Sequence, residues 1–308
     1  RQCLLPYWAN LWYVAAHGPD GLGAPIVSPP WVHFPPSKAS AIAATRSALR
    51  AEGQWMVGDA LLVQPVASPA LKSVTVQLPG DSNELWYPTW AEASPGVLTA
   101  GIKLGKSTEL HTKPKHGGTE VSIPTPLAVT PTLQRGGTIL PRRERVRRSA
   151  LLAIHDPITL HVAPSTVNGA NGMLFLDDGV STPGAKDAAD ATKIVLTFGC
   201  VEGKATCELS ASAECLWGAC TKAKAKPHDV HVDAVLIRGM SLHAPAANAT
   251  AVEAPRAEFV DVQQFVMGGA GPIEVNARQT ARGVLFSGLR ASLRPGVTWT
   301  LRLNGWAL

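Results

Sequence analysis

The stretch "SVTVQLPG", residues 73–80, sets the pattern on which the fold class depends. Val74, Val76 and Leu78 alternate with polar neighbours, and a period of two is what a strand with one buried face requires. The Pro-Gly pair that ends the stretch is a turn signal. These residues therefore predict a half-buried β-strand followed by a turn.

The same alternation returns in the second half of the chain. Apolar side chains occupy every second position at Ile158, Leu160 and Val162, and again at Val297, Trp299, Leu301 and Leu303. The 25 prolines and 28 glycines supply turns between such stretches, without helical periodicity in between. This pattern favours antiparallel β-sandwiches, and the chain is predicted to be mainly β.

The first residues follow a different period. In "LLPYWANLWYVAA", Leu4, Trp8, Leu11, Trp12 and Ala15 recur at helical spacing, and Pro6 is tolerated in a first turn. We expect a helix here that packs one apolar face. Alanine-rich residues 39–52 predict a second helix, and the period changes to two from Trp55 onward.

Length and composition are those of a globular chain. The 308 residues are 45% hydrophobic and 17% charged, which allows about two or three domains with cores of their own. The sequence opens on Arg1 without a secretory signal pattern, and no run approaches the roughly 18 apolar residues of a membrane span. We expect a soluble piece of a longer polypeptide.

Positive charge is concentrated in "PRRERVRRS", residues 141–149. Residues 135–148 hold six arginines and one glutamate, which equals the net charge of +5 for the whole chain. Nucleic-acid binders more often carry a broad basic face with aromatic residues or a recognition helix. We therefore interpret the run as a solvated strand or loop and expect no nucleic-acid partner.

Patterns of common catalytic sites are missing from the sequence. It contains no Gly-x-Ser-x-Gly, His-Glu-x-x-His or phosphate-loop motif. Asp177 and Asp178 are adjacent, so in a strand they face opposite ways, and Asp-Asp-Gly is a common turn. Asp229, His231 and Asp233 share one strand face, but a solvated polar face is the simpler interpretation. No catalytic, cofactor-binding or metal-binding residue is assigned, and no cofactor is expected.

Four of the five cysteines lie close together in the sequence. The spacing of Cys200, Cys207, Cys215 and Cys220 does not fit a zinc site of the Cys-x-x-Cys type. In an oxidising compartment they allow two disulfides in any of three connectivities; otherwise they are buried thiols. Asn248 begins an Asn-Ala-Thr glycosylation pattern.

An ordered series of segments carries a resemblance to a known family. It includes "LLPYWANLW" (4–12), "GAPIVSPPWVHFP" (23–35), "QWMVGDALLVQPV" (54–66), "TPTLQRGGTILPRRERVRRS" (130–149) and "LFLDDG" (174–179). Over roughly residues 1–180 the chain resembles the C-terminal part of glycoside hydrolase family 31. Within that family it looks most like the glucosidase II branch.

The resemblance implies an architecture. Residues 1–53 would be the last elements of a (β/α)₈ TIM barrel, residues 54–149 a proximal β-sandwich and residues 150–308 a distal one. The arginine run would then lie at the junction between the two sandwiches. Both catalytic aspartates of the family lie on earlier barrel strands, so this chain alone is expected to be inactive.

The resemblance also implies a function. The whole protein would be a retaining α-glucosidase of the endoplasmic-reticulum lumen that trims glucose from N-linked glycans, with a possible noncatalytic β subunit. Two positions depart from the family pattern: Ser28 stands in place of an arginine before Pro29, and His33 in place of a glutamate.

An alternative function is a non-catalytic β-sandwich module that binds carbohydrate or protein. In this hypothesis Trp86, Tyr87 and Trp90 would form a platform on which a sugar stacks.

Overall fold

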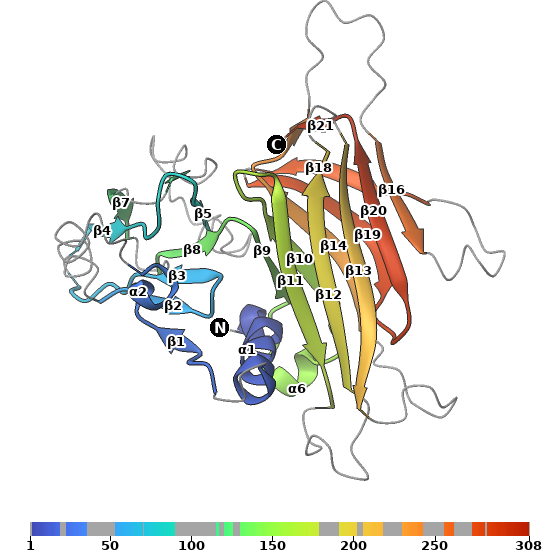
Figure 1. The fold of residues 1–308 in the computed structure, drawn as a ribbon, viewed down its shortest axis with the longest axis horizontal. Helices are drawn as coiled ribbons and strands as arrows, with labels where there is room; N and C mark the ends of the chain where they lie inside the picture. Colours follow the sequence, from blue (N-terminus) through green and yellow to red (C-terminus); the bar gives the residue numbers. More distant parts are fainter. Residues whose placement is uncertain are drawn as a thin grey trace, which may run out of the picture. The chain divides into compact units, whose positions relative to one another are not determined.

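The computed structural model describes residues 2–18, 23–35, 53–69, 71–89, 115–116, 120–125, 130–178, 191–201, 206–217, 230–242, 256–261, 273–280 and 282–307. The described chain is mainly β, as the sequence predicted, and forms two compact units (Figure 1). Unit 1 comprises Arg1–Gly23, Ile139–Pro164 and Asn168–Leu308, and unit 2 comprises Ala24–Thr138 and Ser165–Val167.

Unit 2 contains two sheets that share one core. Its elements are β1 (Val27–Ser28), α2 (Pro30–His33), β2 (Trp55–Val57), β3 (Leu61–Val63), β4 (Ser73–Gln77), β5 (Leu85–Pro88), β6 (Lys115–His116), β7 (Glu120–Pro124) and β8 (Thr132–Arg135). One sheet has the order β1-β2-β3-β8-β5-β6, and β4 pairs with β7 in the other. Met56, Leu62 and Trp86 of the first sheet and Val76 and Ile123 of the second meet in a single buried cluster. This arrangement is sandwich-like.

Unit 1 is built on an eleven-stranded sheet of order β17-β16-β20-β13-β12-β11-β9-β10-β14-β19-β18. Its elements are η1 (Gln2–Leu4), α1 (Leu5–His17), β9 (Thr138–Arg142), α6 (Ala150–Ala153), β10 (Ile158–Ala163), β11 (Gly169–Leu176), β12 (Ala191–Cys200), β13 (Thr206–Trp217), β14 (His231–Arg238), β15 (Ser241–Leu242), β16 (Arg256–Asp261), β17 (Ile273–Glu274), β18 (Asn276–Thr280), β19 (Gly283–Ser292), β20 (Thr298–Asn304) and β21 (Trp306–Ala307). The strands β15 and β21 form a separate pair.

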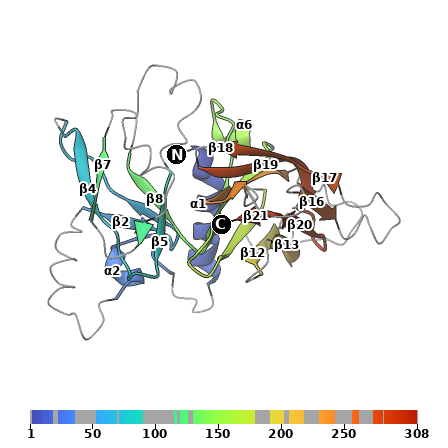
Figure 2. The ribbon, with the colours of Figure 1, turned by 90° about the horizontal axis from the view of Figure 1, so that it is seen from above.

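The long sheet of unit 1 folds over on itself. Phe286 of β19 and Trp299 of β20 lie far apart in the strand order, yet both are buried in one cluster with Leu160 of β10 and Leu196 of β12. A sheet whose opposite parts line the same core acts as the two layers of a sandwich. Figures 1 and 2 show β12 and β13 in one layer, with β20 beside β13, and β18 and β19 in the other layer.

One strand pair of unit 1 corrects the expectation of purely antiparallel sheets. β10 pairs with β14 in parallel, with Leu160 opposite Val235 and Val162 opposite Ile237. Parallel neighbours need a long crossover between them, and here the chain passes through β11, β12 and β13 before it returns. Alternation within each strand does not encode that direction, which is why the sequence could not reveal it.

The predicted N-terminal helix is present as α1, with Pro6 in its first turn. The face that the chain itself buries carries Pro6, Tyr7 and Asn10. Trp12, on another face, is 65% exposed. The helix is therefore confirmed, and part of its expected apolar face lies open in this chain.

The assignment of residues 1–53, 54–149 and 150–308 to a barrel end and two sandwiches stays a prediction. Several sequence-based expectations fall outside the described residues: the helix at 39–52, Trp90, Cys220, Asp229 and Asn248.

Candidate functional site

The β1–α2 corner, residues 27–34, holds the two positions at which the sequence departs from the family pattern. Ser28 ends β1 opposite Met56 of β2, and α2 makes a single turn that ends at His33. The Ser28 Oγ lies 2.9 Å from the His33 Nε2, which is hydrogen-bonding distance. The structure thus brings the two departures into direct contact.

The corner is held closely to the sheet. The Gly58 N–H donates to the Ile26 carbonyl at 2.8 Å, just before β1 begins. Phe34, directly after α2, packs against the core of unit 2 and tilts against Trp86 with ring centroids 5.8 Å apart. Ser28 is 3% exposed as a result.

Charged side chains surround His33 on two sides. Burial lowers the pKa of His33, the negative charge of Asp59 acts against that shift, and the positive charge of Arg135 adds to it. Arg135 lies over the Phe34 ring, 4.5 Å from its centroid, and makes two hydrogen bonds of 2.5 and 2.9 Å to Glu84. The imidazole therefore faces a fixed cation and a carboxylate, and burial favours its neutral form.

A serine hydroxyl on an imidazole nitrogen, with a carboxylate acting on that imidazole, contains the residue types of a nucleophile, a base and an orienting group. Catalysis also requires that the nucleophile meet a substrate. Ser28 is 3% exposed, so its hydroxyl is enclosed by the protein. We interpret the Ser28–His33 contact as a structural link between β1 and α2.

The arginine segment, residues 142–148, is tied into unit 1 by its own side chains. Arg147 donates to both carboxylate oxygens of Asp156, with distances of 2.6 and 2.9 Å. Arg143 donates to the Ile154 carbonyl at 3.0 Å and lies 3.4 Å from the Asp156 carbonyl. These contacts join the arginine segment to residues 154–156, which follow α6 and lead into β10.

Glu144, within the arginine segment, contacts a histidine of the sheet. Glu144 Oε1 lies 3.0 Å from the His161 Nε2 and 3.1 Å from the Arg142 Nε. The other ring nitrogen of His161 lies 3.3 Å from an Arg238 Nη2. Arg238 can only donate, so Nδ1 accepts and Nε2–H donates to Glu144, which fixes a neutral tautomer.

The pKa values of this pair follow from its surroundings. Burial lowers the pKa of His161 to about 4, although the hydrogen bond to Glu144 acts in the other direction. Burial opposes ionisation of Glu144, but the hydrogen bond from His161 and the charge of Arg142 hold its pKa at about 2. At neutral pH the pair is a carboxylate that accepts a hydrogen bond from a neutral imidazole.

The residues considered for carbohydrate binding occupy other places than the hypothesis required. Trp86 is fully buried and donates from Nε1 to the Pro79 carbonyl at 3.1 Å, and Tyr87 is 5% exposed. Burial raises the pKa of Tyr87. The proposed sugar platform is therefore wrong for these two residues, because the aromatic pair packs in unit 2 instead of facing solvent.

The acidic residues examined for chemistry lie at the end of β11 and on β14. Asp177 and Asp178 follow the end of β11 and are half-buried. His231 and Asp233 lie on β14 and are half-buried as well. Among the residues that the structure describes, no cluster of three or more His, Cys, Asp or Glu side chains could hold a metal ion.

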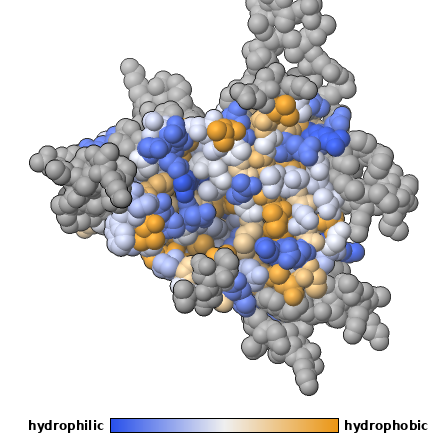
Figure 3. Space-filling view, viewed as in Figure 1, coloured by the Kyte–Doolittle hydropathy of each residue, from blue (hydrophilic) through white to orange (hydrophobic). Residues whose placement is uncertain are grey.

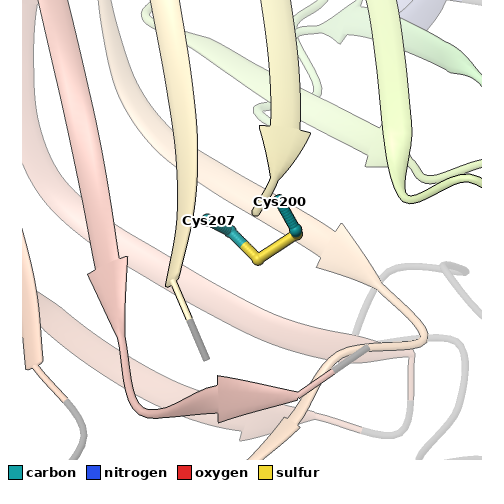
Figure 4. Close-up of a disulfide and its surroundings, with 2 residues drawn as sticks. All are labelled: Cys200 and Cys207. Atoms are coloured by element: carbon teal, nitrogen blue, oxygen red, sulfur yellow. A yellow bond between two sulfur atoms is a disulfide. The ribbon is translucent and has the colours of Figure 1, made fainter. Parts of the chain in front are cut away.

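Disulfides join part of the cysteine group. Cys200 at the end of β12 bonds to Cys207 near the start of β13, opposite it in the strand pairing (Figure 4). Cys215 is also disulfide-bonded. Cys3 carries a free thiol. Of the sequence interpretations, the disulfide one applies to Cys200, Cys207 and Cys215.

The visible surface mixes hydrophobic and hydrophilic side chains, which Figure 3 shows as small orange areas among blue and white ones. Within the described ranges, no helix is long and apolar enough to cross a membrane.

The class of protein to which this part of the chain is similar follows from a comparison with known protein families. Residues 23–140 match the glycosyl hydrolase family 31 C-terminal domain. The resemblance that the sequence segments suggested is thereby confirmed for this part of the chain.

Individual relatives agree with that match. The chain is 39% identical over 179 residues to neutral alpha-glucosidase AB of Mus musculus, which covers 58% of this chain and 16% of that protein. Neutral alpha-glucosidase C of Homo sapiens is 35% identical over 181 residues. The chain thus spans about a sixth of the length of these relatives.

The structural similarity to solved proteins covers more of the chain than the sequence similarity does. The crystal structure of a glucosidase II alpha subunit superposes with a TM-score of 0.63 at 20% identity, and covers 97% of this chain and 27% of that one. At this identity the likeness concerns the fold alone.

Sequence reasoning missed two contacts and one buried polar residue. The contact of Ser28 with His33 joins positions five residues apart that no periodicity links. The pairing of His161 with Glu144 was hidden because His161 occupies a polar position of an alternating strand. Asn10, which sequence analysis did not single out, is buried at 4% exposure.

Proposed function

We propose that this chain is the C-terminal part of a retaining α-glucosidase and supplies the scaffold that follows its catalytic barrel. The observation that carries the proposal is the 39% identity over 179 residues to neutral alpha-glucosidase AB. The likeness of fold over 97% of the chain to a glucosidase II alpha subunit supports it.

The finer proposal is glucosidase II-type trimming of glucose from N-glycans in the endoplasmic-reticulum lumen. Disulfides form and persist in oxidising compartments, so the bonded Cys200, Cys207 and Cys215 agree with a luminal protein. A noncatalytic partner subunit is part of this proposal. It is supported by a structural neighbour, an ER glucosidase II complex of a catalytic subunit and the binding domain of a regulatory subunit, with a TM-score of 0.62.

Retaining hydrolysis needs a nucleophilic carboxylate and an acid/base carboxylate about 5–5.5 Å apart. In this proposal both aspartates come from barrel strands that precede Arg1. The carboxylates described above have other tasks, since Asp156 binds Arg147, Glu144 accepts from His161, and Glu84 binds Arg135.

The open face of α1 fits the proposed neighbour. Trp12 is 65% exposed on a helix whose buried residues, Pro6, Tyr7 and Asn10, pack in unit 1. A barrel that packs on this face would remove a large aromatic surface from water, which is favourable. The alternative, a carbohydrate-binding module, loses its main support because Trp86 and Tyr87 are buried.

The test is an assay of the complete reading frame that contains this chain, with an aryl α-glucoside as substrate. We expect turnover by the long protein and none by residues 1–308 alone. A matched control replaces by asparagine the aspartate of an upstream Trp-x-Asp-Met-Asn-Glu-like segment, and should abolish turnover. Activity of residues 1–308 alone, or a native start codon directly before Arg1, would contradict the proposal.

A further inference from the structure

Adjacent basic residues occur at two places in the sequence, and both lie in the arginine segment. Arg142 and Arg143 form the first pair, and Arg147 and Arg148 form the second. Arg145 lies two residues before the second pair. Serine endoproteases that cut after arginine bind its guanidinium in a pocket that carries a carboxylate. The segment therefore holds two candidate cleavage sites, and their surroundings differ.

The first pair is enclosed by unit 1. Arg142 ends β9, and its side chain is 12% exposed. Arg143 is buried, its backbone N–H donates to the Cys3 carbonyl at 2.9 Å, and its guanidinium donates to the Ile154 carbonyl at 3.0 Å. A peptide that binds as an extended strand needs accessible side chains and backbone groups. The first pair is thus protected from a protease.

The second pair lies on an exposed connection. Residues 143–149 join β9 to α6 without helix or strand, and Arg145, Val146, Arg148 and Ser149 are exposed. The backbone of Ser149 is extended, with φ −146° and ψ 160°. The bond between Arg148 and Ser149 is therefore accessible on the surface, next to a pair of arginines.

We propose that the bond between Arg148 and Ser149 is a processing site for a serine endoprotease that is specific for paired arginines. The protease serine attacks the Arg148 carbonyl carbon, and the Ser149 nitrogen leaves as an amine after it takes up a proton. Water then hydrolyses the ester, so one water molecule is consumed and Arg148 ends in a carboxylate. The site is independent of the proposed glucosidase activity.

One ion pair restrains the cut. Arg147 donates to both carboxylate oxygens of the buried Asp156, so it must leave this partner before it can enter a protease pocket. The segment must open locally, and cleavage is slower than in an unfolded chain. Asp156→Asn removes the negative charge that holds Arg147 and should speed the cut about 5- to 30-fold.

The two products stay together, because the cut falls between neighbouring strands of one sheet. β9 belongs to residues 1–148 and lies between β11 and β10, which belong to residues 149–308. Ile139 of β9 is buried in one cluster with Leu160 of β10 and Leu174 of β11. Cys3, the single cysteine of the first product, carries a free thiol. The result is a two-chain form held together by the sheet and its core.

The experiment treats the folded 308-residue chain with furin, a serine endoprotease that requires an arginine directly before the cut and another three residues earlier. Mass spectrometry should show a single cut, with products that end at Arg148 and begin at Ser149. Arg148→Ala should abolish the cut, and Arg145→Ala should slow it about 10- to 100-fold, as expected for one charge-assisted contact. Arg302→Ala, at an exposed arginine of β20, is the matched control and should leave the rate unchanged.

Two further measurements test the structural part of the proposal. Size-exclusion chromatography of the cut protein should give one peak at the size of the uncut chain, and two components in urea. The folded-to-unfolded ratio of Asp156→Asn, measured by urea unfolding, is compared with its rate of cleavage. A rate that rises only in proportion to the loss of global stability would mean that unit 1 must unfold as a whole, and would contradict local opening.

The site assignment itself has clear contrary outcomes. No cut in the folded chain, or a cut after Arg143 or Arg145, would show that the bond before Ser149 is not a processing site. Products that separate without urea would contradict the two-chain form. Glucosidase activity is not measured in these experiments, so their failure would leave the proposed function untouched.

Discussion

The side-chain amide of Asn10 pairs with the backbone of β11 at Phe175 as a neighbouring strand would. Asn10 Oδ1 accepts from the Phe175 N–H at 2.8 Å, and Nδ2 donates to the Met173 carbonyl at 2.5 Å. Tyr13 stacks on the Phe175 ring with centroids 4.5 Å apart. One amide thus satisfies both a donor and an acceptor of β11, and it docks α1 onto the sheet.

Replacement of Asn10 by alanine should therefore destabilise unit 1 strongly. The buried Phe175 N–H and the partly buried Met173 carbonyl would lose their partner, and a buried group left unpaired costs about 1–3 kcal/mol. Urea unfolding measures the effect. Trp12→Ala on the same helix is the matched control, because Trp12 is 65% exposed. Equal losses for the two variants would mean that the amide contributes nothing beyond helix packing.

The helix illustrates what the sequence could and could not predict. Helical spacing of apolar residues located α1 within one residue of its start, because that period is a local property of the chain. The docking residue is polar and was passed over, since only the position of β11 shows which backbone groups Asn10 satisfies. The strands were likewise predicted by alternation, whereas the parallel pairing of β10 with β14 depends on the path of the chain.

The arginine segment gives the same lesson for the candidate sites. Composition alone cannot distinguish five solvated arginines from arginines that bind the protein itself. The distinguishing partner, Asp156, is a single acidic residue that lies after the run in the sequence. By contrast, the departures at Ser28 and His33 were recognised from the family resemblance, although only the structure shows that they touch.

Arg147 should contribute more to stability than its neighbour Arg145. Arg147 makes a two-pronged contact with Asp156, whereas Arg145 is 67% exposed and lies 4.0 Å from the same carboxylate. Arg147→Ala should lower the urea midpoint at neutral pH, and Arg145→Ala should leave it nearly unchanged. A loss of equal size in both variants would show that the segment acts through its total charge.

The pH dependence of stability tests the contact between Arg147 and Asp156 in a second way. The hydrogen bond from Arg147 lowers the pKa of Asp156 below its ordinary value of 3.8. A carboxyl whose pKa is lowered by folding stabilises the protein above its ordinary pKa, and that contribution is lost as the pH falls further. Stability curves of the natural chain and Arg147→Ala should therefore approach each other below about pH 4. Curves that stay parallel would exclude this assignment.

His161 should make unit 1 sensitive to pH in a range above that of Asp156, because its pKa is lower in the folded chain than in the unfolded chain. Its pKa is about 4 in the folded chain, against 6.5 for an ordinary histidine. Between these values the unfolded chain binds a proton that the folded chain does not, so stability falls as the pH drops from 6.5 to about 4. The slope for one such proton approaches about 1.4 kcal/mol per pH unit.

His161→Gln removes this titration and should flatten the stability curve in that window, although it also lowers stability at neutral pH. Glu144, Arg142, Arg238 and Arg282 face the imidazole and remain in the variant. The exposed His17, replaced by glutamine, serves as control. An unchanged slope in His161→Gln would assign the acid sensitivity to other groups.

Duplex DNA should bind this chain weakly and only at low salt, despite the five arginines of residues 142–148. Arg142, Arg143 and Arg147 are engaged with Glu144, Asp156 and backbone carbonyls, whereas Arg145 and Arg148 are exposed. Two exposed arginines neutralise about two phosphates, so the logarithm of the binding constant should fall with the logarithm of salt concentration with a slope of about −2. Fluorescence anisotropy with a labelled duplex, at several salt concentrations, measures that slope.

Arg145→Ala combined with Arg148→Ala should remove the residual binding, while the pairing of Arg147 with Asp156 keeps the fold intact. A dissociation constant tighter than about 10⁻⁷ M at physiological salt, or a slope several times steeper, would show that the paired arginines leave their partners to bind phosphate.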